Sequence, residues 1–195
     1  MKTFRTLTLP AVTFMLAGAS GAAFAHPGHE SASFFSGFGH PFGGLDHLLA
    51  MIAVGLYAAR QPGVARQLLP AGFVLAMLAG AALGAVGVAL PAVEAGIAAS
   101  VLVFGLLIAF AARLPLAAAL PLVAAFALFH GHAHHAEMGG ASLASYAVGF
   151  ALATASLHVA GYALARWMPE TPLAQRVRRV AGGAIAATGA VLLGA

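Results

Sequence analysis

The amino-acid sequence predicts an all-α fold, a polytopic membrane bundle of six transmembrane helices that follows a cleaved signal peptide. Three observations predict it: 62% of the 195 residues are hydrophobic, only 7% are charged, and the apolar residues form runs long enough to cross a bilayer. A soluble domain carries roughly 25% charged residues. The net charge of +4 comes from a few scattered basic residues, which indicate membrane topology and not nucleic-acid binding.

The first 25 residues have the pattern of a secretory signal. They begin with Lys2 and Arg5, continue through a short apolar run and end in Ala23-Phe24-Ala25, the small-x-small pattern of a cleavage site. We therefore expect a signal peptide over residues 1–25 and a single transmembrane domain over residues 26–195. An uncleaved first transmembrane helix is the alternative.

Six later segments are each apolar over about 20 residues, the length that a helix needs to cross roughly 30 Å of hydrocarbon. The predicted spans lie near 43–59, 68–88, 93–112, 115–134, 143–165 and 177–194. All seven arginines of the mature chain then fall on one side of the membrane: Arg60, Arg66, Arg113, Arg166, Arg176, Arg178 and Arg179. Positive loops face the cytoplasm, so both ends of the mature chain should lie on the opposite side.

Histidine is the dominant ligand available to this chain, because the sequence has nine histidines and no cysteine. That excludes disulfides and thiolate metal sites, while imidazole suits nickel, cobalt, copper or zinc. Helical spacing places His130 and His134 on one face and turns His132 another way. The candidate metal ligands are His26, His29, His40, Asp46, His47, His130, His132, His134, Glu137 and His158.

Several of these residues also have a purely structural interpretation. Asp46 stands where a carboxylate stabilises a helix N-terminus, so the sequence leaves open whether it binds an ion. His158, deep in the fifth predicted span, could hydrogen-bond a neighbouring helix, and His26 and His29 could belong to a solvated tail. Met51 lies one turn after His47 but, like Met77, is expected to be a packing residue.

Two motifs resemble those of a known family. The stretch HPFGGLDH at 40–47 resembles the first motif of the HupE/UreJ family of nickel permeases, and FHGHAHHAE at 129–137 is similar to its second histidine-rich motif. On this resemblance His40, Asp46 and His47 carry over from the first motif, and His130, His132 and Glu137 from the second. His135 stands where the family pattern has a glycine.

The resemblance implies a secondary transporter or facilitator that takes up nickel or cobalt across the bacterial inner membrane, often in support of hydrogenase or urease maturation. Both ends of the mature chain would be periplasmic. The expected partners are the ion, as transported substrate, and the lipid bilayer, with no tightly bound cofactor and no nucleic acid; a homo-oligomer is left open. On this interpretation the chain is not an enzyme.

Two alternatives belong to other classes. A membrane-embedded zinc hydrolase could also use histidines and an aspartate around a metal-bound water, although the HExxH motif is absent from the sequence. A haem protein could use two histidines of facing helices, with His47 and His130 as the pair.

Overall fold

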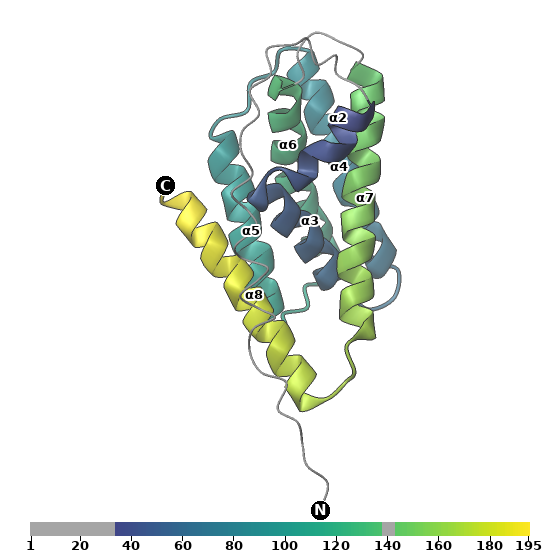
Figure 1. The fold of residues 1–195 in the computed structure, drawn as a ribbon, viewed down its shortest axis with the longest axis vertical. Helices are drawn as coiled ribbons and strands as arrows, with labels where there is room; N and C mark the ends of the chain where they lie inside the picture. The colour runs from purple at the N-terminus through teal and green to yellow at the C-terminus, as the bar shows by residue number, and fades with distance from the viewer. Residues whose placement is uncertain (1–33, 138–142) are drawn as a thin grey trace, which may run out of the picture.

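The computed structural model describes residues 34–137 and 143–195, and every regular element in these ranges is helical. The all-α prediction is therefore confirmed for the described chain. The predicted signal peptide, His26 and His29 lie outside the described residues. The elements, shown in Figure 1, are α2 (Phe34–Gly39), the 3-10 turn η1 (His40–Phe42), α3 (Leu45–Ala58), α4 (Ala65–Ala85), α5 (Val93–Ala109), α6 (Leu116–Glu137), α7 (Leu143–Trp167) and α8 (Pro172–Leu193).

Each of the six predicted spans coincides with one of the helices α3 to α8, but the helices differ in how well they suit a membrane. Three of them, α4, α6 and α7, are long and apolar enough to cross it. A fourth span results if α2, η1 and α3 are counted together. Helix α5 has only 17 residues, and α8 carries Arg176, Arg178 and Arg179 near its start. Among the described residues, the structure thus shows three or four segments that can span a membrane. The presence of six spans stays a prediction.

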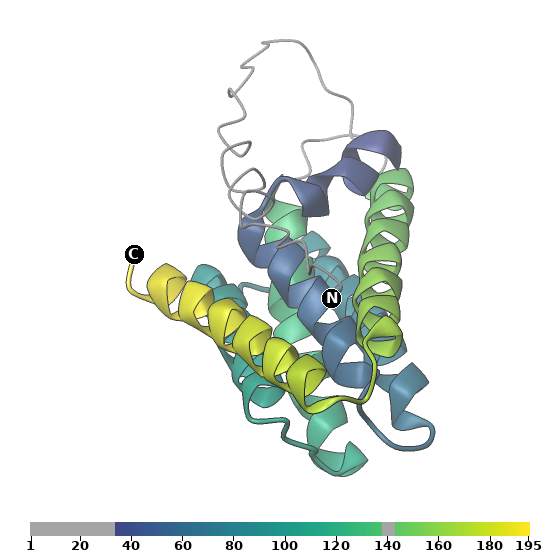
Figure 2. The same cartoon turned by 60° about the horizontal axis from the view of Figure 1, so that its bottom comes forward.

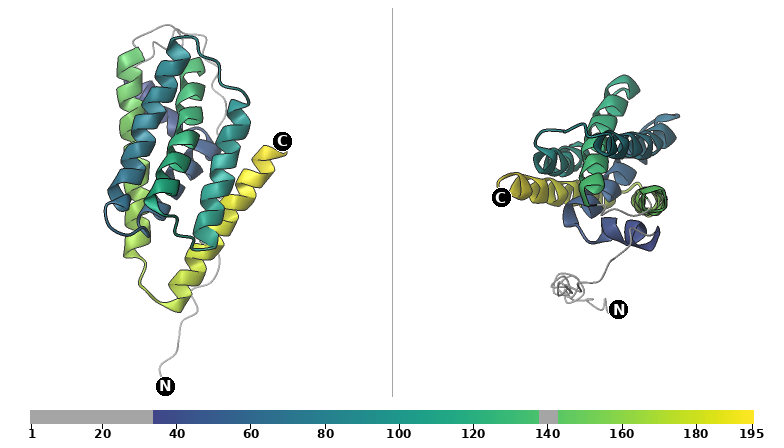
Figure 3. Two further views of the ribbon diagram at one scale, coloured as in Figure 1. Left: turned by 180° about the vertical axis from the view of Figure 1, so that it is seen from behind. Right: turned by 90° about the horizontal axis from the view of Figure 1, so that it is seen from above.

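The helices pack in pairs, α4 with α6, α5 with α8 and α3 with α7 (Figure 3). Glycines stand at each of these contacts. A methyl group on Gly80 would overlap the backbone of Leu128, and one on Gly55 would overlap the carbonyl oxygen of His158. Close backbone approach of this kind is the usual way in which helices associate in lipid, where apolar side chains gain little from leaving the bilayer. Helix α8 lies along α5 at one edge of the bundle (Figure 2).

The start of the first predicted span differs from the sequence prediction. A single helix was expected over 43–59, but α3 begins at Leu45, and the segment Phe34–Phe42 meets it at 83°. The reason is local: Pro41 lies in a 3-10 turn that begins at His40, and Gly44 is extended at φ −105°, ψ 123°. The bend lays α2 and η1 across one side of the bundle (Figures 1 and 3), where α2 packs against α7. His40 is thereby brought near the first turn of α3, with its ring centroid 6.3 Å from that of His47.

Candidate metal centre

Four imidazole rings come together at the end of the bundle where α3 begins. His40 lies in η1, His47 in the first turn of α3, and His130 and His134 near the end of α6. The ring centroids of His47 and His134 are 4.4 Å apart, those of His40 and His134 4.6 Å, and those of His47 and His130 4.8 Å. We call these four residues the histidine cluster. Two segments more than 80 residues apart in the sequence supply it.

Three of the four rings in the histidine cluster are buried, and His40 is partly buried. His130 is fully buried, His134 is 1% exposed and His47 is 8% exposed. Aromatic rings line it, with Phe150 at 3.7 Å from His134 and Phe73 at 5.5 Å from His130 between ring centroids. Buried imidazoles in a largely apolar bundle need polar partners or a ligand, because an unsatisfied polar atom costs free energy there.

Asp46 holds His47 in one orientation. Oδ1 of the carboxylate accepts the backbone N–H of His47 at 2.7 Å and lies 2.8 Å from Nδ1 of the same residue. A carboxylate only accepts, so Nδ1 carries the proton and Nε2 carries the lone pair. Nε2 is buried and has no hydrogen-bond partner among the described residues. A carboxylate that fixes the tautomer of a histidine is the usual arrangement behind a metal-binding imidazole.

Ser100 of α5 has the same effect on His130. The Ser100 hydroxyl donates to the carbonyl oxygen of Ile97 at 2.6 Å, and its oxygen lies 2.9 Å from Nε2 of His130. Because the hydroxyl proton is used on Ile97, Nε2 of His130 is the donor and Nδ1 carries the lone pair. Nδ1 is likewise buried without a partner in the described chain. The rings of His47 and His130 are thus each left with one unprotonated nitrogen that has no partner in the described chain, which we call an open nitrogen.

The histidine cluster is not a closed cage. Within residues 34–137 and 143–195 no group of three histidine, aspartate or glutamate side chains is arranged to hold a metal ion. A structural zinc site would present four ligands in a tetrahedron. The geometry instead provides two open nitrogens on adjacent rings, with His40 and His134 next to them.

Of the other residues in the second motif, some point into the histidine cluster and some point away from it. His134 joins His130, as the spacing of four predicts, whereas Nε2 of His132 donates to the carbonyl oxygen of Val88 at 2.9 Å, away from the histidine cluster. His135 lies against Gly84. The Glu137 side chain is outside the described part of the structure.

Further along α3 and α7 lies a second set of buried polar groups. The Thr154 hydroxyl is within hydrogen-bond distance of the sulfur atoms of Met51, at 3.4 Å, and of Met77, at 3.6 Å. One turn further on, His158 is 3% exposed, packs against Phe73 and has no hydrogen-bond partner on either ring nitrogen among the described residues. Its predicted alternative role, a hydrogen bond to a neighbouring helix, is therefore not seen in the described chain.

Sequence reasoning missed Ser100 and the contact of Thr154 with the two thioethers. A serine inside the apolar run AASVLVF was a usable signal, since a hydroxyl in such a helix usually satisfies a buried partner. The convergence of Met51 and Met77 on one hydroxyl had no signal in the sequence, because it depends on how α3, α4 and α7 meet.

Comparison with known proteins gives two matches. The family described as HupE / UreJ protein matches residues 14–192. Protein HupE of Rhizobium leguminosarum bv. viciae is 44% identical over 172 residues, which cover 88% of this chain and 90% of that protein. No solved structure matches the chain.

Proposed function

Because the chain belongs to the HupE/UreJ family, we propose that it takes up nickel or cobalt ions across a bacterial inner membrane, as a secondary transporter or facilitator. The observation that carries this proposal is the pair of open nitrogens in the histidine cluster, Nε2 of His47 and Nδ1 of His130. Neutral imidazole nitrogen is a ligand that nickel and cobalt prefer. Two such nitrogens, set by Asp46 and Ser100, form a site that can bind an ion and release it again.

Partial coordination is what transport requires. A closed four-ligand cage would retain the ion, whereas a site of few ligands binds strongly enough for entry and weakly enough for exit. On this proposal the cluster holds the ion transiently, with the charge of Asp46 offsetting part of the charge of the ion. His132, Glu137 and the N-terminal histidines His26 and His29 would act earlier, in collecting it.

A path inward follows α3 and α7. The thioethers of Met51 and Met77 with the Thr154 hydroxyl provide a polar step between the histidine cluster and His158. Polar groups at such depth in a helical bundle usually mark an ion pathway, because each one is costly in lipid. We place His158 as the deeper binding position on this path.

The proposed orientation places the histidine cluster on the periplasmic side. Asp46 and His47 are in the first turn of α3 and Arg60 follows its end, about 21 Å away at 1.5 Å per residue. The arginines would face the cytoplasm, and helices α3 to α8 would form six spans.

The two alternatives from other classes are less favoured. A haem would need to fit between its two axial histidines, but the rings of His47 and His130 touch edge to face at 4.8 Å. A zinc hydrolase needs three protein ligands around one metal ion, and the described residues contain no such group.

Uptake of nickel into proteoliposomes tests the proposal, with cobalt and zinc as competitors. We expect the wild-type chain to transport nickel, His47→Ala to abolish transport, and His135→Ala to retain it, since His135 lies outside the histidine cluster. Transport should also fall at acidic outside pH, because a protonated imidazole cannot bind a metal. Absence of any metal flux in the wild-type protein would contradict the proposal.

A further inference from the structure

A cavity of about 180 Å³ opens at the end of the bundle remote from the histidine cluster. It lies where α3 and α5 end and where α7 is followed by α8. This volume is many times the roughly 10–15 Å³ that one water molecule requires. The transport path described above does not use it.

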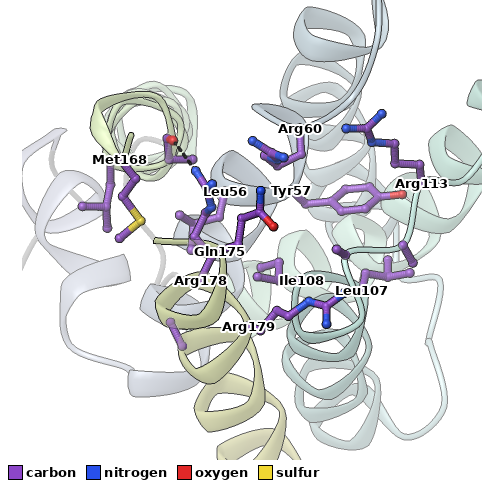
Figure 4. A pocket seen from close by; sticks show the side chains of 15 residues that line it. Leu56, Tyr57, Arg60, Leu107, Ile108, Arg113, Met168, Gln175, Arg178 and Arg179 are labelled. Atoms are coloured by element: carbon purple, nitrogen blue, oxygen red, sulfur yellow. Dashed lines mark hydrogen bonds between the residues drawn. The ribbon is translucent and has the colours of Figure 1, made fainter. Parts of the chain in front are cut away.

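Four arginine side chains line this cavity, which we call the arginine cavity. Arg60 follows α3, Arg113 lies between α5 and α6, and Arg178 and Arg179 are neighbours in α8. Figure 4 shows them around the amide of Gln175, although they come from three separate segments of the chain.

The positive charge of the arginine cavity is poorly balanced. In the described part of the chain, Glu170 is the carboxylate that pairs with these arginines, at 2.6 Å from Arg60 and 3.5 Å from Arg178. One negative charge against four positive charges leaves an excess of three. Arg178 is only 8% exposed, and its other contact is the carbonyl oxygen of Ala165 at 3.4 Å. Because Arg178 shares this single carboxylate with Arg60, and the buried guanidinium lies 3.5 Å from it, the cavity favours a further anionic ligand.

The other side of the arginine cavity is apolar. Leu107, Ile108 and Leu164 contribute to its wall (Figure 4 labels the first two), and Tyr57 stands beside them. A small hydrated anion would gain nothing from this wall. A ligand with an anionic head and a hydrocarbon tail would use both sides.

We propose that the arginine cavity binds the phosphate group of an anionic phospholipid, whose acyl chains lie along the apolar wall. Arginine forms paired hydrogen bonds to phosphate oxygens, and basic pockets between spans are recognised sites for anionic headgroups. The proposal rests on the bundle being in a membrane and not on the identity of the transported ion. Inorganic phosphate shares the headgroup chemistry but lacks the tail, so the two ligands can be told apart.

The test measures lipid binding to the purified, delipidated full-length protein in detergent by native mass spectrometry. Phosphatidylglycerol is compared with phosphatidylcholine of the same acyl chains, and inorganic phosphate is added as a competitor. We expect a preference for phosphatidylglycerol of at least tenfold and no displacement by millimolar phosphate. Equal binding of the two lipids, or displacement by phosphate alone, would overturn the proposal.

Variants locate the binding site. Arg113→Gln with Arg179→Gln should weaken phosphatidylglycerol binding by roughly 25-fold, at about fivefold for each arginine near a lipid surface. Arg166→Gln with Arg176→Gln removes the same charge from exposed positions outside the arginine cavity and should change binding by less than about twofold. If the double variant Arg113→Gln with Arg179→Gln does not fold, the two single variants test the site. Each is expected to lose about fivefold in phosphatidylglycerol affinity. Equal affinities in the cavity variants and the control pair would place the lipid elsewhere and refute the site.

Discussion

Asp46 and His47 are neighbours in the sequence, and one carboxylate oxygen of Asp46 is hydrogen-bonded to both the backbone N–H and the ring Nδ1 of His47. Two consecutive helical residues normally point about 100° apart, so their side chains seldom meet. At the first turn of α3 the carboxylate instead folds over the helix end and reaches the ring. The contact satisfies a backbone N–H at the helix end and also orients the imidazole of His47. Binding of an ion by Asp46 itself stays a prediction.

The contact between Asp46 and His47 predicts a loss of nickel affinity in Asp46→Asn. Without the negative charge the ring is held less firmly, and partners of this kind are worth about 10–100-fold in metal affinity. We expect the half-saturating nickel concentration in proteoliposome uptake to rise by about that factor. Glu94→Gln is the matched control, since Glu94 is also an acidic residue in the first turn of a helix. Equal effects of the two substitutions would mean that Asp46 only stabilises the end of α3.

The tautomer of His130 predicts a similar effect for Ser100→Ala. Removal of the hydroxyl leaves Nε2 of His130 without its acceptor, so the proton can move and the open nitrogen is no longer fixed. We expect nickel uptake to lose about tenfold in affinity while the protein stays folded. Ser156 donates to the carbonyl of Ala153 at 2.6 Å, as Ser100 does to Ile97, but contacts no histidine ring in the described structure. Ser156→Ala should therefore transport like the wild type, and a comparable loss there would argue against the tautomer assignment.

Two adjacent glycines of α8 predict opposite changes in stability. A methyl group on Gly182 would overlap the backbone of α5 at Ala109, whereas one on Gly183 would meet nothing within 4 Å. Gly182→Ala should lower the free energy of unfolding by about 1–3 kcal/mol, because the helices must move apart. Gly183→Ala should raise it by about 0.5–1 kcal/mol, because alanine is the better helix former. Unfolding of both variants in the same detergent measures the difference, and equal effects would mean that α8 does not dock on α5 as described.

The ion pair between Arg60 and Glu170 predicts a dependence of stability on pH. Hydrogen bonding to Arg60 holds the pKa of Glu170 below its usual value near 4.5. As the pH falls, the carboxyl of Glu170 is protonated in the unfolded chain before it is protonated in the folded protein. The ion pair therefore contributes fully to the free energy of unfolding above about pH 4.5, and this contribution is lost as the pH drops through the lowered pKa of the folded protein. The difference in unfolding temperature between the wild type and Glu170→Gln should be constant from neutral pH down to about pH 5 and vanish in stronger acid. Glu170 is exposed, so the difference will be small. If the difference in unfolding temperature grew as the pH fell, the ion pair between Arg60 and Glu170 would not be its cause.

The positions of the helices could be predicted from the sequence because each helix forms from a local apolar run. The predicted spans match α3 to α8 to within a few residues, and the spacing of four in the second motif correctly placed His130 and His134 on one face. The bend before α3 was missed, since the combination of Pro41 and Gly44 allows a turn without requiring its direction. The predicted ligand His132 hydrogen-bonds Val88 instead of joining the histidine cluster.

What the sequence by itself determined is the helical content, the extent of the long helices and the supply of histidines at the ends of two of them. The tertiary structure alone decided that His40, His47, His130 and His134 meet, that Ser100 holds one of these rings, and that four arginines surround one cavity. The physical reason is that helix formation depends on hydrogen bonds and apolar residues within one segment. Which helices pack against each other depends on contacts between distant segments. At Gly55 and Gly80, for example, the absence of a side chain lets the backbone of another helix approach closely.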